Sequence, residues 1–517
     1  MIHISHEHKQ VVVPYRPEYA TLFPHGQVFQ WNGLQHMVVP HGIEETKLFR
    51  NLNLPVPPPI VEHYKFTGNV KPFDVQIKTA AAMTMNPRFY CLNAMGTGKT
   101  KSALWAYDYL RSQGLVKKLL IVCPVSIMDF TWRREIMDTL PGTRVAVLYG
   151  TKDKRLKILA GEWDIAIINH DGLPVLQLEL MKRTDIDVVV IDEAAMFRNA
   201  RAARSKVARV IVANKKFVWA MTGQPCPNEP TDAFGLAKLV TPFACPRSFV
   251  FFRQDVMTQV SQFRWVPKKD AADKVAKLLQ PSVRFELNDV VELPDLIERT
   301  LDVPQSPEQK EAYQKIKEYA ALHLKEGSIT AVNGGVVLQK CLQISCGYVY
   351  RDDGSVHHYA NDDRLEMLEQ IAEGTTGKVI VFSPWIHSAE GIGKFLEKRG
   401  MDYATVTGAV SQSERTRIFS LFQDSNRYKI LNAHPGCMAH GLTLTSADTI
   451  VWFAPISSLE TFEQANARIR RIGQRKKQQV IMLQGTFAER QAYQRLRTKR
   501  DVQDSVLDIL SEIVSQA

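Results

Sequence analysis

The stretch RFYCLNAMGTGKTKSALWAYDYL, residues 88–110, places a buried strand, a glycine-rich loop and a helical pattern in direct succession. The loop is Ala94-Met95-Gly96-Thr97-Gly98-Lys99-Thr100. Its glycines allow backbone N–H groups to close around phosphate at a helix start, so Met95 to Thr100 are predicted to bind a nucleotide. Lys99 is expected to reach the β- and γ-phosphates, and Thr100 to hold Mg²⁺. Asn93 stands where the general pattern has an earlier glycine, and a chance turn at a helix start is the alternative.

Apolar strand-length runs alternate with helical patterns over most of the chain. Continuous apolar runs separated by helices indicate parallel sheets covered on both faces. The expected fold class is therefore α/β, with two parallel-sheet lobes. The supporting runs are KKLLIVCPV (117–125), WDIAIINH (163–170), IDVVVIDE (186–193) and KKFVWAMTG (215–223), followed by GKVIVFS (377–383), DYATVTG (402–408), YKILNAH (428–434), ADTIVWFA (447–454) and QQVIMLQG (478–485).

Four segments are expected from these patterns. Residues 1–65 are predicted as a small β-rich module, with a hairpin at Asn32-Gly33 and a stiff extended linker, PVPPPI, at 55–60. DNA recognition is one candidate role for this module, and shielding of the first lobe's sheet is the other. The later segments are the first lobe (66–243), a mostly helical insertion or connector (244–350) and the second lobe (351–517).

A second chemical signal is the buried strand that ends in the acid pair Asp192-Glu193. Ligands bind at the carboxyl ends of parallel strands, so both carboxylates are expected near the phosphate loop. Asp192 would hold Mg²⁺ through water, and Glu193 would orient and deprotonate the attacking water. An acid pair at a helix N-terminus is the alternative. His170, which ends another predicted strand, is expected to cap or pack and is given no chemical role.

The charge of the chain is concentrated in one segment. The formal net charge is +11, and residues 464–500 contain eleven Lys or Arg and one acidic residue. Such a segment favours a polyanionic partner, with a solvated basic face as the alternative. Trp132-Arg133-Arg134 and Phe263-Arg264-Trp265 are candidates for base stacking, although core packing of their aromatic rings is favoured.

Membrane, secreted and zinc-binding classes are disfavoured. The longest apolar runs are strand-length, short of the ~18 residues that a membrane span needs, so no membrane partner is expected. The N-terminus MIHISHEHKQ lacks the apolar core of a signal peptide, which favours a cytoplasmic location, in the host cell if the chain is viral. Seven scattered cysteines without a C-x-x-C pair favour free thiols over structural zinc.

Taken in order, these motifs resemble the Swi/Snf-type ATPases of helicase superfamily 2 over residues 70–485. Residues 72–76, PFDVQ, are similar to the upstream element in which a glutamine, here Gln76, reads adenine. Cys123-Pro124 with Trp132 and Glu135 is similar to motif Ia, which touches DNA backbone. The family's D-E-A-H box ends here in Ala195. Thr222-Gly223-Gln224-Pro225 with Asn228 is similar to motif III.

The resemblance continues in the second lobe. Lys378–Ser383 resembles motif IV, and Gly441-Leu442-Thr443-Leu444-Thr445 resembles motif V in the form of the HepA-related annealing-helicase branch. A phage-type DNA helicase is a further alternative within the same resemblance. Residues 464–474, QANARIRRIGQ, are similar to motif VI. Gln464, Arg468 and Arg471 stand at i, i+4 and i+7, one face of a predicted helix. They are expected to reach the nucleotide, Arg468 at the γ-phosphate and Arg471 as an arginine finger.

The resemblance implies RecA-like lobes and a DNA-dependent ATPase that uses ATP and Mg²⁺ while it moves on duplex, forked or branched DNA. An RNA-directed or RNA-polymerase-recycling ATPase is the first alternative. The second is a nucleotide-gated clamp that binds nucleic acid without turnover. Only Ala195 favours the clamp, and Lys99, Glu193 and Arg471 argue against it.

Overall fold

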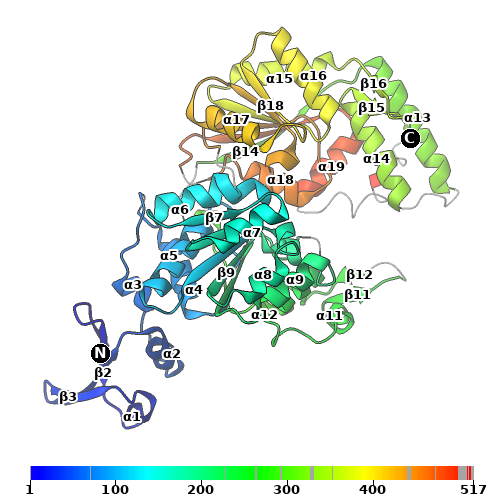
Figure 1. Cartoon of the computed structure of the whole chain (residues 1–517). Helices are drawn as coiled ribbons and strands as arrows, with labels where there is room; N and C mark the ends of the chain where they lie inside the picture. Colours follow the sequence, from blue (N-terminus) through cyan, green and yellow to red (C-terminus); the bar gives the residue numbers. More distant parts are fainter. Residues whose placement is uncertain are drawn as a thin grey trace. The chain divides into compact units, whose positions relative to one another are not determined.

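The computed structural model forms two compact units, Met1–Val290 and Val291–Ala517, drawn in Figure 1. Among the helices of the described residues, none has the length and apolar character that a membrane crossing requires. The described residues are 2–69, 71–227, 229–261, 265–290, 294–325, 331–351, 353–438, 444–471, 473–498, 509–510 and 512–513.

The first unit is built on a seven-stranded sheet in which every neighbouring pair is parallel. Met221 lies opposite both Cys91 and Asp192, so the central strands end together. We call this end of the sheet the carboxyl edge and the opposite end the amino edge. In spatial order the strands are β13 (Ser282–Val283), β5 (Arg88–Cys91), β10 (Phe217–Met221), β9 (Ile186–Asp192), β6 (Lys118–Cys123), β8 (Ile165–Asn169) and β7 (Val145–Leu148).

Alternate side chains of each strand enter two different cores. Val188 and Val190 belong to one core, and Val189 and Ile191 to the other. Burial on both sides explains why these strands are apolar without interruption. The helices of this unit's main body are α4 (Asp74–Met85), α5 (Lys99–Ser112), α6 (Arg134–Thr139), α7 (Lys152–Ala160), α8 (Gln177–Lys182), α9 (Ala203–Val212), α10 (Ala233–Val240), α11 (Phe249–Val256) and α12 (Ala271–Leu278).

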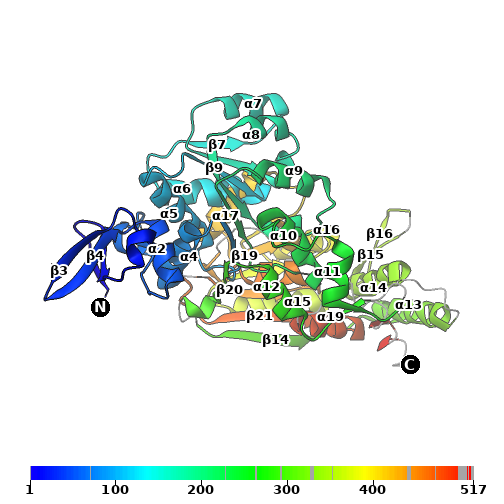
Figure 2. The same cartoon turned by 90° about the horizontal axis from the view of Figure 1, so that it is seen from below.

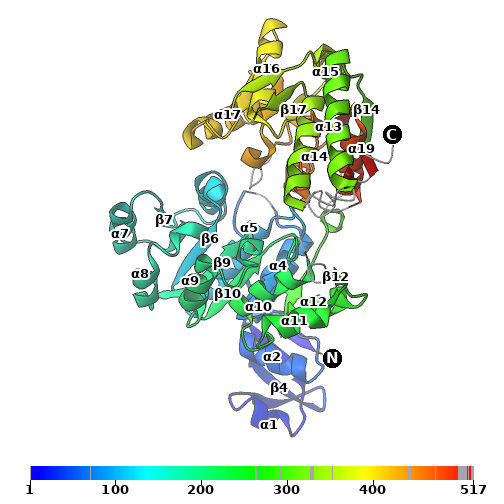
Figure 3. The same cartoon turned by 90° about the vertical axis from the view of Figure 1, so that its right-hand side faces the viewer.

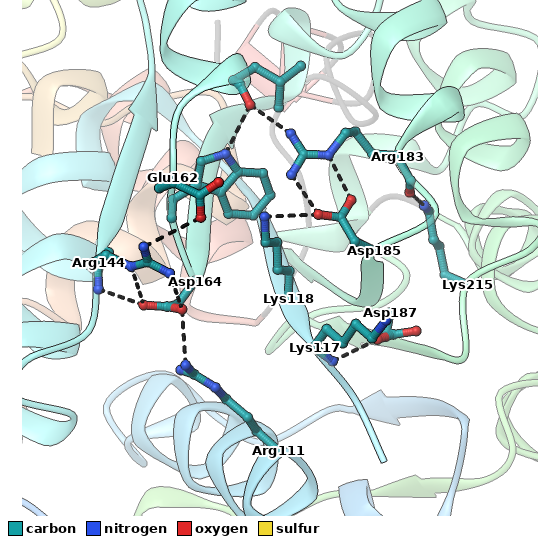
Figure 4. Close-up of polar contacts among 12 residues, drawn as sticks. Arg111, Lys117, Lys118, Arg144, Glu162, Asp164, Arg183, Asp185, Asp187 and Lys215 are labelled. Carbon is teal, nitrogen blue, oxygen red and sulfur yellow. Dashed lines mark hydrogen bonds and ion pairs between the residues drawn. The ribbon is translucent and has the colours of Figure 1, made fainter. Parts of the chain in front are cut away.

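Charged residues at the amino edge form two separate clusters of ion pairs, one around Asp164 and one around Asp185 (Figure 4). Asp164 accepts hydrogen bonds from Arg111 (3.0 Å) and from both the backbone (3.0 Å) and the guanidinium of Arg144. Asp185 accepts two hydrogen bonds of 2.7 Å from Arg183. At this edge, where the strands begin, each of these two carboxylates therefore has cationic partners.

The N-terminal module has its own antiparallel sheet, whose β3 and β4 lie side by side in Figure 2. Asn32 (φ 50°) and Gly33 (φ 77°) are both left-handed, as a two-residue type I′ turn requires, so the predicted hairpin is confirmed. The sheet order is β1 (His3–Ser5), β2 (Gln10–Pro14), β4 (Leu34–Pro40), β3 (Gln27–Trp31), with helices α1 (Tyr19–Leu22), α2 (Ile43–Asn51) and α3 (Pro59–His63).

The PVPPPI linker is extended only as far as Pro58, because α3 begins at Pro59, a position where proline suits a helix start. Val56 is buried in the core of the module. Ile60 and Ile43 belong to the core of the parallel-sheet body. The prediction of a stiff spacer is therefore wrong for the end of this segment, which packs the module onto the parallel-sheet body of the same unit.

The second unit contains a six-stranded sheet that is also entirely parallel. The predicted α/β class with two parallel-sheet lobes is thus confirmed. Its strands in spatial order are β14 (Leu296–Asp302), β21 (Gln478–Gln484), β20 (Ala447–Trp452), β17 (Lys378–Phe382), β19 (Ile430–Ala433) and β18 (Tyr403–Val406). Its helices are α13 (Pro307–Lys325), α14 (Ala331–Ser345), α15 (Asp362–Gly374), α16 (Ile386–Lys398), α17 (Gln412–Asp424), α18 (Leu459–Asn466) and α19 (Phe487–Arg497).

The segment 244–350, predicted as a helical connector, is divided between the two units. Its first part holds α11, α12 and a short hairpin of β11 (Met257–Gln259) and β12 (Trp265–Pro267), and then β13 joins the first sheet. Its second part begins with β14, which pairs with β21 in the second sheet. The pair α13 and α14 then runs side by side (Figure 3), followed by the hairpin β15 (Tyr348–Tyr350) and β16 (Val356–His358).

Candidate active site

The phosphate loop connects β5 to α5 at the carboxyl edge. Gly96 (φ 83°) and Gly98 (φ 80°) adopt the left-handed backbone conformation that favours glycine, and a side chain at Gly98 would collide with Gln76. The Lys99 ammonium donates hydrogen bonds to the carbonyls of Asn93 (2.8 Å) and Ala94 (3.2 Å), and so lies across the loop. A glycine loop at a helix N-terminus with a lysine over it is an arrangement suited to phosphate.

Two buried polar side chains hold this loop in place. Gln76 on α4 donates from Nε2 to the carbonyl of Thr97 (3.3 Å). Asn93, only 2% exposed, donates to the Thr79 hydroxyl (2.9 Å) and accepts from the backbone N–H of Phe285 (3.1 Å). Asn93 thereby links the loop to α4 and to the segment after β13. This gives a structural reason for asparagine at the position of the first glycine.

The acid pair lies at the end of β9 on the same edge. Asp192 is 9% exposed, and its two oxygens accept hydrogen bonds from the indole of Trp132 and from the backbone N–H of Glu193, each at 3.0 Å. Burial raises the pKa of Asp192, while the charge of Lys99 and these hydrogen bonds oppose the rise. Glu193 has φ 49° and ψ 50°, a left-handed conformation that is uncommon outside glycine and clusters at functional sites.

Neighbouring residues complete this edge of the sheet. The backbone N–H of Thr222 donates to the carbonyl of Cys91 at the start of the phosphate loop. Ala195 is buried at the position of the family's histidine. A histidine does lie near the acid pair, but it is His170 from the end of β8, which donates from Nε2 to the carbonyl of Asp192 (2.9 Å). His170 is buried and packs edge-on against the ring of Phe197, so the packing role predicted for it is confirmed. Burial also lowers its pKa to about 4.

The structure therefore gathers at one edge the predicted residues of the first lobe, which come from α4, the phosphate loop, the first turn of α5 and the end of β9. Together, the carboxylate, hydroxyl, amide and ammonium groups of these elements can hold a nucleoside triphosphate with its metal. The predicted residues placed here are Gln76, Met95, Gly96, Thr97, Gly98, Lys99, Thr100, Asp192 and Glu193.

Two family models match the chain over most of its length. Residues 91–345 match the SNF2-related domain, and residues 363–473 match the helicase conserved C-terminal domain. The chain belongs to the SNF2-related family. The first match includes the acid pair and the second includes the predicted motif VI arginines, in the order that the sequence resemblance requires.

Individual relatives are distant in sequence. The chain is 25% identical over 414 residues to the ISWI chromatin-remodeling complex ATPase ISW2 of Saccharomyces cerevisiae. It is 24% identical over 458 residues to chromodomain-helicase-DNA-binding protein 1-like of Mus musculus. These alignments take in 74% and 81% of this chain but only 35% and 48% of those proteins, so the chain spans less than half of either. Among solved structures, the Sulfolobus solfataricus SWI2/SNF2 ATPase core in complex with dsDNA aligns with 87% of this chain and 95% of its own length, at 22% identity and a TM-score of 0.40.

Motif VI, at the end of the helicase C-terminal match, leaves its helix earlier than predicted. α18 ends at Asn466, so Gln464 lies on the helix whereas Arg468 and Arg471 follow it. The carbonyl of Arg468 accepts a hydrogen bond from the backbone N–H of Leu444 in motif V (3.1 Å). The turn that follows α18 thus bonds to motif V and does not continue the helical ladder. The prediction that the three residues share one helix face is therefore wrong.

Side chains of motif VI are held by neighbours within the second unit. Gln464 is buried and donates from Nε2 to Glu460 (3.0 Å). The Arg471 guanidinium donates from Nε to the carbonyl of Ala467 (3.2 Å), and Arg468 is buried. Gln474, which ends the motif, donates hydrogen bonds from Nε2 to the carbonyls of Thr445 and Ala447, at and just after motif V, and of Ile469 in motif VI. These hydrogen bonds give a physical reason for glutamine at the end of the motif.

The aromatic candidates for base stacking are packed instead. Trp132 is fully buried, and the Arg253 guanidinium lies over the ring of Trp265, 4.2 Å from its centroid. Core packing, the favoured interpretation of these rings, is confirmed for both. Phe263-Arg264 lies outside the described residues, as do Asn228 of motif III, Gly441–Thr443 of motif V and Ile472 of motif VI.

The basic segment 464–500 carries less unbalanced charge than its sequence suggests. Its one acidic residue, Glu489, is fully buried in an ion pair with Arg364 (2.8 Å). Several of its cations pair with acids that lie elsewhere in the second unit. These pairs are Lys476–Asp448 (3.6 Å), Arg490–Asp302 (3.5 Å), Arg495–Glu512 (2.9 Å) and Arg497–Glu298 (3.5 Å).

Proposed function

We propose that the chain is a DNA-dependent ATPase that moves along duplex DNA and remodels branched DNA or bound protein. The observation that carries the proposal is the carboxyl edge of the first sheet, where the phosphate loop after β5 and the acid pair after β9, with Asp192 buried, lie on either side of β10. Membership of the SNF2-related family supports ATP hydrolysis, and the relatives named as chromatin-remodeling and DNA-binding proteins support DNA as the partner.

In this proposal each residue of the carboxyl edge has one task. Gln76 reads the adenine, and the N–H groups of Gly96–Thr100 surround the phosphates. Lys99 leaves the carbonyls of Asn93 and Ala94 and takes the β- and γ-phosphates instead. Glu193 orients the attacking water and accepts its proton.

Mg²⁺ would accompany the nucleotide, and the oxygen donors at this edge fit it. The Thr100 hydroxyl lies in the first turn of α5, and Asp192 presents a carboxylate held by two N–H donors. Hard oxygen donors of this kind are what Mg²⁺ prefers. When bound, the ion neutralises charge that develops on the phosphates.

The second unit would supply the remaining groups. Arg471 acts as the arginine finger, Arg468 contacts the γ-phosphate, and Gln464 supports the nucleotide. Motif V is bonded to the turn that carries these arginines through the Leu444–Arg468 backbone hydrogen bond. Movement of motif V on a nucleic-acid backbone would therefore shift the turn that carries the arginines.

Steady-state ATP turnover measured side by side with duplex, single-stranded and forked DNA and with RNA tests the proposal. Stimulation by duplex or forked DNA well above that by RNA is expected. Greater stimulation by RNA would support the RNA-directed alternative. Tight nucleotide and nucleic-acid binding without turnover on any of them would support the clamp.

For the N-terminal module we propose recognition of branched DNA by the tip of its hairpin. Trp31 (46% exposed) and Leu34 (66% exposed) flank the Asn32-Gly33 turn, and exposed aromatic rings stack on unpaired bases. Ile43 and Ile60 belong to the core of the main body, so removing the whole module would open that core. Trp31→Ala with Leu34→Ser is the cleaner test. Preference for forked over plain duplex DNA should fall, and an unchanged preference would leave only the shielding role.

A further inference from the structure

The segment between β6 and α6 has an unusual backbone. After Pro124 it forms a 3₁₀ turn, Val125–Ile127, and then a π-helix, Met128–Arg133, which continues directly into α6. π-Helical turns are rare and are found frequently at functional sites. We call residues 125–139 the π segment.

One side of the π segment reaches the acid pair. Trp132 is fully buried, and its indole N–H donates to Oδ2 of Asp192 at 3.0 Å, across 60 residues of sequence. The other carboxylate oxygen of Asp192 accepts from the backbone N–H of Glu193. Trp132 is thus the side chain that fixes the rotation of the Asp192 carboxylate, because the second donor belongs to the backbone next to it.

The same segment also binds the helix of the phosphate loop. Glu135 forms an ion pair of 3.3 Å with Lys101, which lies two residues after Lys99 on α5. The opposite side of the π segment faces solvent, where Arg133 and Arg134 are exposed and Arg133 pairs with Asp129 (3.4 Å). The exposed arginines of that side suit a phosphate backbone. A single short segment therefore joins an exposed surface that carries two arginines to both halves of the carboxyl edge.

We propose that Trp132 is a positioning residue through which duplex DNA on the exposed side of the π segment sets the orientation of Asp192, and with it the strength of Mg²⁺-dependent nucleotide binding. The inference rests on the proposed function, because it takes Asp192 as the carboxylate nearest the metal. It adds a route from DNA to that carboxylate. Partners that orient metal-binding side chains typically contribute 10- to 100-fold in metal affinity.

Binding of a fluorescent ADP to the full chain, titrated with Mg²⁺ in the presence and absence of a blunt DNA duplex, tests this inference without relying on turnover. Trp132→Phe keeps a buried ring but removes the indole N–H. It should raise the Mg²⁺ concentration for half-maximal binding by about 10- to 100-fold, and the shift that DNA causes in the wild type should disappear. Trp163→Phe is the matched control, since Trp163 is also buried and donates to a carbonyl (Leu159, 3.1 Å) but lies near the amino edge.

A second variant covers the case in which Trp132→Phe does not fold. Arg134→Gln removes an exposed cation from the side proposed to face DNA and leaves the core intact. It should keep the Mg²⁺ requirement of the wild type without DNA but weaken the DNA-dependent shift. Equal Mg²⁺ midpoints in Trp132→Phe and Trp163→Phe, or a full DNA shift in Arg134→Gln, would overturn the inference. A wild type that binds no nucleotide with Mg²⁺ would overturn the proposed function instead.

Discussion

At the amino edge of the first sheet, Asp185 lies between Arg183 (2.7 Å) and Lys118 (2.9 Å), whereas at the carboxyl edge the hydrogen bonds of Asp192 come from neutral N–H groups. The hydrogen bonds from Arg183 and Lys118 hold the pKa of Asp185 well below its usual range. Burial raises the pKa of Asp192. Folding thus shifts the pKa values of two aspartates in opposite directions: Asp185, which directly precedes β9, and Asp192, which ends it.

The difference separates residues that stabilise the sheet from residues held ready for a ligand. Charges at the amino edge are satisfied within the protein, so they contribute to the free energy of unfolding. The carboxyl edge keeps a buried carboxylate, a left-handed Glu193 and a lysine bonded only to loop carbonyls. Such features cost stability and are concentrated at functional sites. Substitutions at the carboxyl edge should therefore alter chemistry, and those at the amino edge should alter stability.

Glu193→Gln should give the largest functional change. It preserves the shape of the side chain but removes the group that accepts the proton, so hydrolysis should fall by up to about 10⁴-fold. Nucleotide affinity should stay near that of the wild type, because the proposed role of Glu193 is to act on water and not on the phosphates. Single-turnover hydrolysis and equilibrium binding measured on the same preparation check this. A parallel loss of both would make Glu193 a structural residue.

Arg471→Ala extends the comparison to the second unit. Removal of an arginine finger should lower turnover by about 10³-fold while leaving nucleotide binding by the first unit intact. Arg497→Ala is the control, since Arg497 is a surface cation paired with Glu298 (3.5 Å), and its turnover should remain close to that of the wild type. A loss of less than tenfold in Arg471→Ala would assign Arg471 to nucleic-acid contact.

Asp164→Ala should change stability and spare chemistry. It removes the acceptor of the Arg144 backbone N–H and one of the two carboxylates that pair with its guanidinium, which should lower the free energy of unfolding of the first unit by about 1–3 kcal/mol. Urea unfolding and ATP turnover measured together check both halves of the prediction. Glu162→Ala removes an exposed partner of the same Arg144 and should have little effect on either. Normal stability with impaired turnover in Asp164→Ala would contradict the assignment of the amino edge to stability alone.

The smallest effect is expected on the free energy of unfolding when the pH is lowered. Because the folded pKa of Asp185 lies below its unfolded value of 3.8, the charge stabilises the protein above that pH. The contribution is lost as pH falls through the folded pKa. The difference in unfolding free energy between the wild type and Asp185→Asn should therefore be constant near neutral pH and shrink below pH 3.8. A difference that grows on acidification would reverse the assignment.

Local sequence was sufficient to predict what depends on local geometry. The central strands of both lobes, the glycine loop from Gly96 to Gly98 and the Asn32-Gly33 turn are each determined by apolar period or by residues that tolerate positive φ. The acid pair was predicted because parallel strands end at a common edge. These features explain why so much of the first-lobe site could be located before the fold was known.

Contacts between distant segments could not be predicted in this way. The bond from Trp132 to Asp192 spans 60 residues and depends on a π-helix, which has no pattern of its own in sequence. The end of α18 depends on the bond between motif V and the carbonyl of Arg468. Likewise, β14 joins the second sheet by pairing with β21, far along the chain. In each case the partner, and not the residue itself, decides the structure.

The central claim is that the carboxyl edge binds and hydrolyses ATP while the amino edge only supports the fold. Two lysines test it most directly, Lys99 in the phosphate loop and Lys118, which pairs with Asp185 and lies 4.7 Å from the ring centroid of Trp163. DNA-stimulated ATP turnover and thermal unfolding should be measured for Lys99→Ala and Lys118→Ala. The account predicts that Lys99→Ala abolishes turnover with an unchanged unfolding transition, and that Lys118→Ala lowers the transition but retains turnover. Normal turnover in folded Lys99→Ala protein would contradict it.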